Sequence, residues 1–282
     1  MQINVSAYIP GSTPIHACDA RVKIALLLAY AVTLFLIETW AGLALCAIAF
    51  AGAVAASGVP VARYFGPIKP VYVIVAFTVA FNAFAFDAGA AQHAALALAP
   101  GVAGLADGAA PLVLVGSFGL VPAGLARGVF FAMRIVLLVA ASLVVTYTTT
   151  SSEMTDALAS FLSPLRRLRV PIDDIATTVS IALRFIPITA EELMRVRAAQ
   201  WARGAAFEEG KLAARLRAWT TVLVPLFVGL FRRASRLACA MEARCYGAGP
   251  ARTSLDARRF SGTQAAVLLV GLLACIATCV VL

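Results

Sequence analysis

The sequence predicts an all-α, polytopic integral membrane protein with about five transmembrane helices and long amphipathic cytoplasmic helices. Of the 282 residues, 62% are hydrophobic and only 13% are charged, and the mean hydropathy is +0.92, far above that of soluble domains. Several apolar runs are long enough to cross a bilayer as helices. Most of the charge is confined to one region in the second half of the chain. This composition argues against a soluble enzyme.

Five apolar segments qualify, or nearly qualify, as membrane spans. A spanning helix needs about 20 apolar residues, because unpaired backbone groups are not tolerated in hydrocarbon. A short connection, Glu38-Thr39-Trp40, joins the first two segments and predicts an antiparallel hairpin with Trp40 at the membrane interface. The predicted spans are roughly 22–38, 40–58, 68–86, 126–147 and 264–282.

The distribution of Lys and Arg predicts the orientation, because basic residues are retained on the cytoplasmic side. Residues 148–262 contain seventeen of the 23 basic residues (23 minus six elsewhere) and ten of the 14 acidic ones. This region and the amino terminus are therefore predicted to be cytoplasmic. Arg127 and Arg134, in the outer half of the fourth span, are exceptions. The predicted domains are a membrane domain, 1–147, a cytoplasmic region, 148–262, and a C-terminal transmembrane helix, 264–282.

Residues 88–125 leave three structures open. They contain no Lys or Arg, many Gly and Ala, and helix-breaking residues at Pro100, Pro111 and Pro122. An outer loop, a re-entrant piece or one extra hairpin would fit. All three leave the later topology unchanged, because a hairpin adds two crossings.

The cytoplasmic region is predicted to begin with a short helix and a long one. Thr150 followed by Glu153 fits a capping box, so a helix begins near residue 151 and runs until Pro164. The next helix starts after Asp173 or Asp174. It is expected to end at Gly204, since glycine is the usual residue after a helix C-terminus.

A third cytoplasmic helix is predicted from about Leu212 to the neighbourhood of Cys245–Gly247. Apolar residues recur along it at helical spacing, and Arg232, Arg233 and Arg236 are placed away from that stripe. The apolar runs 175–190 and 218–231 are short and interrupted by prolines. They are interpreted as amphipathic helices against the inner face of the membrane.

Both long cytoplasmic helices end with alanine followed by arginine, in Ala202-Arg203-Gly204 and Ala243-Arg244-Cys245. One explanation is helix-end chemistry: arginine complements a helix C-terminus by ~0.3–1 kcal/mol and glycine caps it. The repetition favours a second explanation. Alanine lets another backbone approach closely, and a guanidinium offers five donors in a fixed fork. The two ends are therefore predicted to be docking tips.

At these residues the sequence resembles the transmembrane T component of energy-coupling factor (ECF) transporters, the family of bacterial biotin, cobalt and nickel uptake systems. "DARVKIALLLAY" is similar to the family's Asp-Pro-Arg-x-Lys block, and residues 148–205 follow its pattern through a first Ala-Arg-Gly motif. "VPLFVGLFRRASRLACAMEARCYG" matches the second motif segment. The resemblance covers nearly the whole chain.

The resemblance implies a non-catalytic subunit of an ABC-type importer for vitamins or metal ions in the bacterial plasma (inner) membrane. Its partners would be two ABC-type ATPases, which bind the ATP, a separate substrate-binding membrane S component, and the lipid bilayer. No cofactor, metal or nucleic acid is implied for this chain. The ATPase-docking residues would be Ala202, Arg203, Gly204, Ala243, Arg244 and Cys245. Separately, the helical spacing of Leu226, Leu230, Leu237 and Met241 suggests a packing stripe on the third cytoplasmic helix, which is expected to pack on the other long helix or on the S component.

Two positions depart from the family pattern. Ala20 replaces a proline at the start of the first span, and Cys245 replaces the glycine of the second motif. If that glycine needs a positive φ, either Cys245 is strained or the cap moves to Gly247.

Other functions fit the residues less well. A substrate-translocating ABC permease or an autonomous secondary carrier stays open as an alternative, although convincing internal repeats are not apparent. An intramembrane enzyme would need clustered ionisable groups, whereas Glu38, Asp87 and Asn82 are interpreted as interface or solitary residues. "EEGKLAA" is not a P-loop, because Ala205 stands where its first glycine is required and Leu212 where Ser or Thr would hold magnesium.

Overall fold

The computed structural model describes residues 8–11, 13–60, 62–85, 112–115, 118–168, 171–205, 207, 212–247 and 262–281. Its contacts divide the chain into two units. The bundle unit comprises Ala7–Phe161 and Phe260–Leu282, and the helix-pair unit comprises Leu162–Arg259 with Met1–Ser6. The described residues are mainly helical, which confirms the predicted all-α fold class of a polytopic membrane protein.

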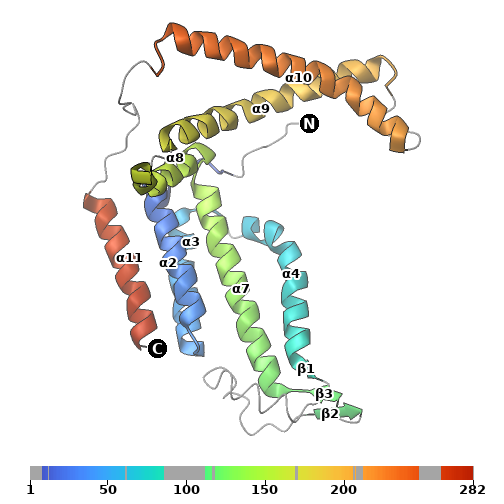
Figure 1. Cartoon of the computed structure of the whole chain (residues 1–282). Coiled ribbons are helices and arrows are strands. Elements are labelled where there is room, and N and C mark those ends of the chain that lie inside the picture. The colour runs from blue at the N-terminus through green and yellow to red at the C-terminus, as the bar shows by residue number, and fades with distance from the viewer. Residues whose placement is uncertain are drawn as a thin grey trace. The chain divides into compact units, whose positions relative to one another are not determined.

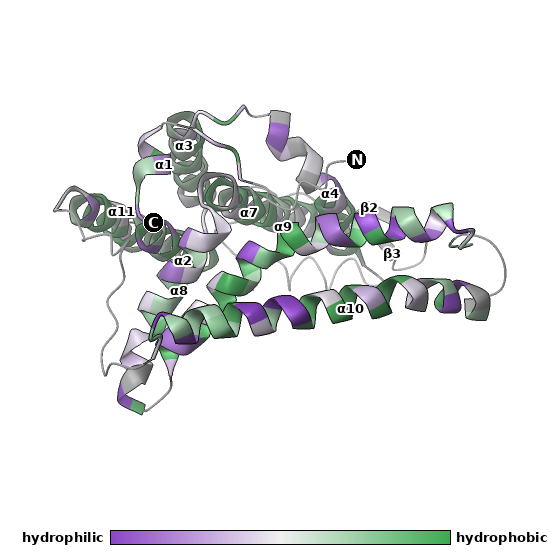
Figure 2. Ribbon diagram, turned by 90° about the horizontal axis from the view of Figure 1, so that it is seen from above, coloured by the Kyte–Doolittle hydropathy of each residue, from purple (hydrophilic) through white to green (hydrophobic). Residues whose placement is uncertain are grey.

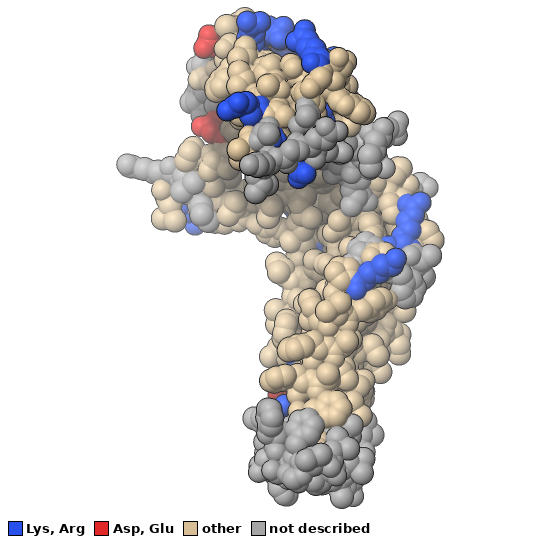
Figure 3. All heavy atoms as spheres, turned by 90° about the vertical axis from the view of Figure 1, so that its right-hand side faces the viewer, with Lys and Arg blue, Asp and Glu red and all other residues tan. Residues whose placement is uncertain are grey.

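The bundle unit contains helices over each of the five segments predicted to span the membrane (Figure 1). Among the described residues, three stretches are long and apolar enough to cross a bilayer: Trp40–Ser57, Pro122–Thr148 and Gly262–Cys279. The apolar part of α4, Lys69–Ala83, is shorter. Figure 3 shows few charged side chains along the apolar helices on the face that it draws. The helices of the unit are α1 (Pro14–Ala17), α2 (Ala20–Leu36), α3 (Trp40–Ser57), α4 (Ala62–Ala83), α7 (Pro122–Thr148), α8 (Ser151–Leu162) and α11 (Gly262–Val281).

Local sequence sets where these helices begin and end. The Asp19 side chain accepts a hydrogen bond from the Arg21 backbone N–H, and that of Thr39 accepts one from Gly42, so both residues cap helices. α3 ends at Gly58, whose φ of 66° suits a residue without a Cβ. Thr150 and Glu153 exchange side chain to backbone hydrogen bonds of 3.2 and 3.3 Å, which confirms the predicted capping box.

The bundle core lies where α2, α3 and α7 meet. Leu34, Leu43 and Phe130 are almost fully buried there. Trp40 packs edge-to-face on Phe130 with ring centroids 5.4 Å apart. The residue that begins the second span thus anchors the α2–α3 hairpin to α7.

α4 and α7 approach each other closely because α7 carries two glycines one turn apart. A Cβ on Gly124 would overlap the carbonyl oxygen of Asn82, and one on Gly128 would lie 3.1 Å from the Asn82 Cβ. The same asparagine accepts hydrogen bonds of 3.2 and 3.1 Å from the Arg127 guanidinium. Asn82 is therefore not solitary, contrary to the expectation from sequence, and it pairs one of the two basic residues that depart from the charge pattern.

The second exception, Arg134, is paired with the end of α2. Its guanidinium donates a hydrogen bond to the carbonyl oxygen of Ile37, the C-cap residue of α2. It also lies over the rings of Phe130 and Phe131, with centroid distances of 5.0 and 5.4 Å. A helix C-terminus and aromatic faces both favour a cation, so they offset part of the cost of keeping Arg134 in an apolar setting.

The end of α4 and the segment before α7 are joined by a small sheet. Its strands are β1 (Phe84–Ala85), β2 (Leu112–Val115) and β3 (Phe118–Leu120), in the order β1-β3-β2, and both pairings are antiparallel. The third predicted span therefore ends as a helix at Ala83, before residue 86, because the chain pairs there as a strand. The three alternatives concerned residues 88–125, of which 88–111, 116 and 117 lie outside the described residues.

The helix-pair unit contains η2 (Ser163–Leu168), α9 (Ile172–Ala202) and α10 (Leu212–Ala243). α9 begins slightly earlier than predicted, so that Asp173 and Asp174 lie in its first turn, where carboxylates complement the helix dipole. α9 and α10 contact each other and run in opposite directions (Figure 1). Hydrophobic and hydrophilic residues alternate along both, whereas α7 and α11 are mostly hydrophobic (Figure 2).

Candidate docking site

The end of α9 is a Schellman cap with Arg203 at its C-cap position. The Ala205 N–H donates to the carbonyl of Gln200 at 3.1 Å, and the Gly204 N–H donates to that of Trp201 at 2.9 Å. Gly204 has a φ of 84°, as this motif requires. The arginine thus sits on the last residue before the chain turns away, and its side chain is exposed together with those of its neighbours.

The end of α10 repeats this geometry residue for residue. The Tyr246 N–H donates to the carbonyl of Met241 at 3.0 Å, and the Cys245 N–H donates to that of Glu242 at 2.9 Å. Arg244 therefore occupies the C-cap position that Arg203 occupies on α9. Ala243, the last residue of α10, and Arg244 are both exposed.

Cys245 takes the left-handed conformation that Gly204 takes at the matching position of α9. Its φ is 55°, and among the described residues it is the one non-glycine residue with a positive φ. Such a conformation costs an L-residue with a Cβ about 1–2 kcal/mol. The cap does not move away from Cys245, although Gly247 also has a positive φ, of 86°. Of the two outcomes expected from the sequence, the strained cysteine is the one found.

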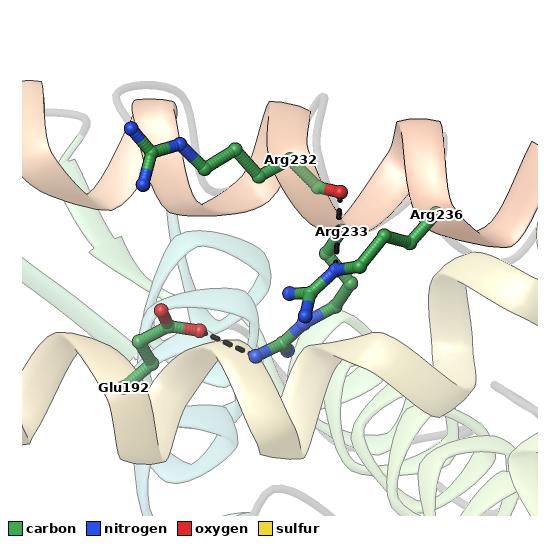
Figure 4. Close-up of polar contacts among 4 residues, drawn as sticks. All are labelled: Glu192, Arg232, Arg233 and Arg236. Carbon is green, nitrogen blue, oxygen red and sulfur yellow. Dashed lines mark hydrogen bonds and ion pairs between the residues drawn. The ribbon is translucent and has the colours of Figure 1, made fainter.

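The two long helices are joined by an ion pair. The Arg233 guanidinium on α10 donates to a carboxylate oxygen of Glu192 on α9 at 2.7 Å, and both side chains are about a quarter exposed (Figure 4). Gly229 makes room for the carboxylate, because a Cβ there would lie 2.9 Å from it. Arg233 also lies over the ring of Phe185, 6.0 Å from its centroid.

The position of Arg233 corrects the sequence analysis, which placed it away from the packing face. Arg232 and Arg236 are exposed, as expected, and the Arg236 Nε donates to the carbonyl of Arg232 (Figure 4). Arg233 is turned toward α9 instead, because a carboxylate on that helix faces it. Periodicity alone could not show this, since it does not reveal which residues of two helices lie opposite each other.

The ion pair lies equally far along each helix from the terminal arginine, and we call the segment from the ion pair to the arginine an arm. Arg203 is eleven positions after Glu192 (203 minus 192), and Arg244 is eleven positions after Arg233 (244 minus 233). At a rise of 1.5 Å per residue each arm is about 16 Å long. Because the helices run in opposite directions, the two arginines lie on opposite sides of the ion pair.

The predicted packing stripe of α10 is buried to different degrees along its length. Leu226 is buried, whereas Leu230, Leu237 and Met241 are half-buried. Val222, which lies one turn before Leu226 and was not among the predicted stripe residues, is fully buried. The i, i+4 spacing of Val222 and Leu226 could have identified it.

A second contact between the helices lies near the tip of α9 and was not predicted. Phe207, from the connection after α9, packs edge-to-face on Trp219 of α10 with ring centroids 5.7 Å apart. The Arg197 guanidinium lies 5.9 Å from the centroids of both rings. This contact holds the end of α9 that carries Arg203 against α10.

Removing the ion pair is expected to weaken the contact between α9 and α10 modestly. In a double-mutant cycle of Glu192→Gln and Arg233→Met, the coupling between the two side chains should be about 0.5–1.5 kcal/mol, because the pair is partly exposed. Thermal unfolding of the purified variants measures it. Glu191→Gln is the matched control, since Glu191 is the exposed neighbour of Glu192. Strictly additive single effects would contradict an energetic role for the pair.

Comparison with known proteins supports one family. The family model described as cobalt transport protein, CbiQ, matches residues 11–255. The energy-coupling factor transporter transmembrane protein EcfT of Thermosediminibacter oceani is 34% identical over 274 residues, which cover 97% of this chain and 96% of that protein. EcfT of Bacillus subtilis is 33% identical over 269 residues, covering 94% and 92%. The chain therefore belongs to the CbiQ family and is a transmembrane component of an energy-coupling factor transporter.

Proposed function

We propose that this chain couples ATP hydrolysis by two ABC-type ATPase subunits to the reorientation of a separate substrate-binding membrane S component. Vitamins or metal ions would be the imported substrates. ATP would be bound by the ATPases, and this chain would perform no catalysis. The ATPase-docking residues would be Ala202, Arg203, Gly204, Ala243, Arg244 and Cys245.

The observation that carries this proposal is the repeated geometry of the two arginine ends. Each arginine is exposed at the C-cap of a long helix with the same two capping hydrogen bonds. The two ends lie on opposite sides of the Glu192–Arg233 ion pair, each eleven positions along its helix from the paired residue. A single cap needs no partner, but two matched, separated and exposed arginines suit two equivalent binding surfaces, one on each ATPase.

Reconstitution tests the proposed function. Proteoliposomes are prepared with this chain, the co-purified ATPases and the S component. They should take up the small molecule that co-purifies with the complex only when ATP is supplied on the side of the membrane that carries the ATPases. Omitting the ATPases should abolish uptake. Uptake by this chain alone would show instead a secondary carrier, and direct substrate binding by this chain would show an ABC permease.

We also propose that the amino terminus and residues 148–262 face the cytoplasm, as the excess of basic residues there favours. In a background with the six native cysteines replaced, a cysteine at the exposed position Arg195 should react with an impermeant maleimide only after the cells are opened. Labelling in intact cells would overturn this orientation. A cysteine at exposed Arg232 on α10 should behave identically and serves as a second probe.

A further inference from the structure

The buried cation Lys23 lies on α2 and binds the end of a different helix. Its side chain is only 7% exposed. Its Nζ donates a hydrogen bond of 2.8 Å to the carbonyl oxygen of Thr148, the last residue of α7, and a longer one of 3.5 Å to the Thr149 hydroxyl. Burying an ammonium is costly unless it is hydrogen-bonded, so these contacts offset part of that cost.

The contact falls on the turn between α7 and α8, which we name the elbow, Thr148–Glu153. The carbonyls at a helix C-terminus lack partners within the helix and carry partial negative charge, so an ammonium is favourable there. Thr148 and Thr149 are both buried. Two residues later the capping box of Thr150 and Glu153 starts α8. Lys23 thus closes the end of α7 while the capping box fixes the start of α8.

The elbow lies on a connection between the two units of the chain. The bundle unit joins the helix-pair unit in the chain at Phe161–Leu162, directly after the elbow and α8, and again at Arg259–Phe260. α7 packs on α2, α3 and α4. If the angle between α7 and α8 is fixed, a movement of α8 also moves α7. Through α7 it then reaches the three helices α2, α3 and α4.

We propose that Lys23 is a positioning residue for energy coupling: it holds the elbow rigid, so that movement passed to α8 turns α7 instead of bending the junction. This proposal rests on the proposed function. Its structural part concerns only the bundle unit, in which α2, α7 and α8 all lie.

The first experiment measures the elbow without transport. In the full chain in nanodiscs, Lys23→Met should speed amide hydrogen exchange of residues 149–154 by about ten- to one-hundredfold, as expected for the loss of a hydrogen bond to a charged group. Lys69→Met is the matched control, because Lys69 is exposed on α4. Exchange in the elbow that is equal in both variants would overturn the proposal.

The second experiment measures coupling in the complete complex. Lys23→Met should lower the amount of substrate taken up per ATP hydrolysed at least severalfold while the complex still assembles and hydrolyses ATP. Lys23→Arg, which keeps a charged donor, should recover part of this ratio. An unchanged ratio with a loosened elbow would refute the role in coupling. If the complex with Lys23→Met does not assemble, Lys23→Gln takes its place, and the same two quantities are measured: hydrogen exchange in the elbow and uptake per ATP hydrolysed. Failure of the proposed function is distinguishable, because the unaltered complex would then lack ATP-driven uptake.

Discussion

The double variant Arg203→Glu, Arg244→Glu is expected to lose its ATPase subunits while its membrane helices stay folded. Arginines at the centre of an interface commonly contribute 2 kcal/mol or more, which corresponds to about thirtyfold in affinity each and roughly a thousandfold together if the two tips act independently. A carboxylate in place of the guanidinium adds repulsion against the carbonyls or carboxylates that it would meet. Each single change should be milder, because the other tip stays bound.

Co-purification of the ATPases with affinity-tagged variants measures this effect. The matched control is Arg195→Glu with Arg232→Glu, which reverses the charge of one exposed arginine on each of the same helices and changes the net charge equally. The control should retain the ATPases. Full retention by the docking variant would show that the two helix ends are caps only, and a circular dichroism spectrum unlike that of the unaltered chain would assign the loss to misfolding.

Gly124→Ala is expected to be the most damaging single-methyl change in the bundle unit. The added Cβ would overlap the backbone carbonyl of Asn82 on α4, and a backbone atom cannot move aside by changing rotamer. α4 and α7 must then separate, which also disturbs the Arg127–Asn82 hydrogen bonds. Forced overpacking of this kind costs about 1–3 kcal/mol.

The comparison for this prediction is Gly52→Ala on α3, where a Cβ would meet nothing within 4 Å. That change should be neutral or stabilise the protein by up to about 1 kcal/mol, because alanine is a better helix former than glycine. Thermal unfolding in detergent should therefore shift downward for Gly124→Ala only. Equal melting temperatures would mean that α4 and α7 do not approach at this glycine.

Much of the fold follows from local features of the sequence. The apolar runs predict where the membrane helices lie, because a bilayer demands long uninterrupted helices. The capping box of Thr150 and Glu153 and the glycine at 204 predict helix ends, since both act within a few residues of the chain. The dihedral requirement at Cys245 was also foreseeable, because the first motif has glycine at the matching position.

The contacts between helices could not be predicted in the same way. Arg233 pairs with Glu192, 41 residues away, and Lys23 binds Thr148 across 125 residues. Neither pairing leaves a trace in periodicity, because both depend on which turns of two helices lie opposite each other. The close approach of α4 and α7 was not predicted either, although two glycines one turn apart in an apolar helix, Gly124 and Gly128, could have indicated it.

The equal arms of α9 and α10 have a mechanical consequence for the proposed coupling. If two ATPases draw the arginines toward each other by the same distance and the Phe207–Trp219 contact opens, both helices turn by the same angle about the Glu192–Arg233 ion pair. The movement is then a rotation of the two helices about the ion pair, without a shift of the ion pair itself. Inserting one helical turn, about 5.4 Å, into one arm would lengthen that arm by about a third, and the ion pair would then shift as the helices turn.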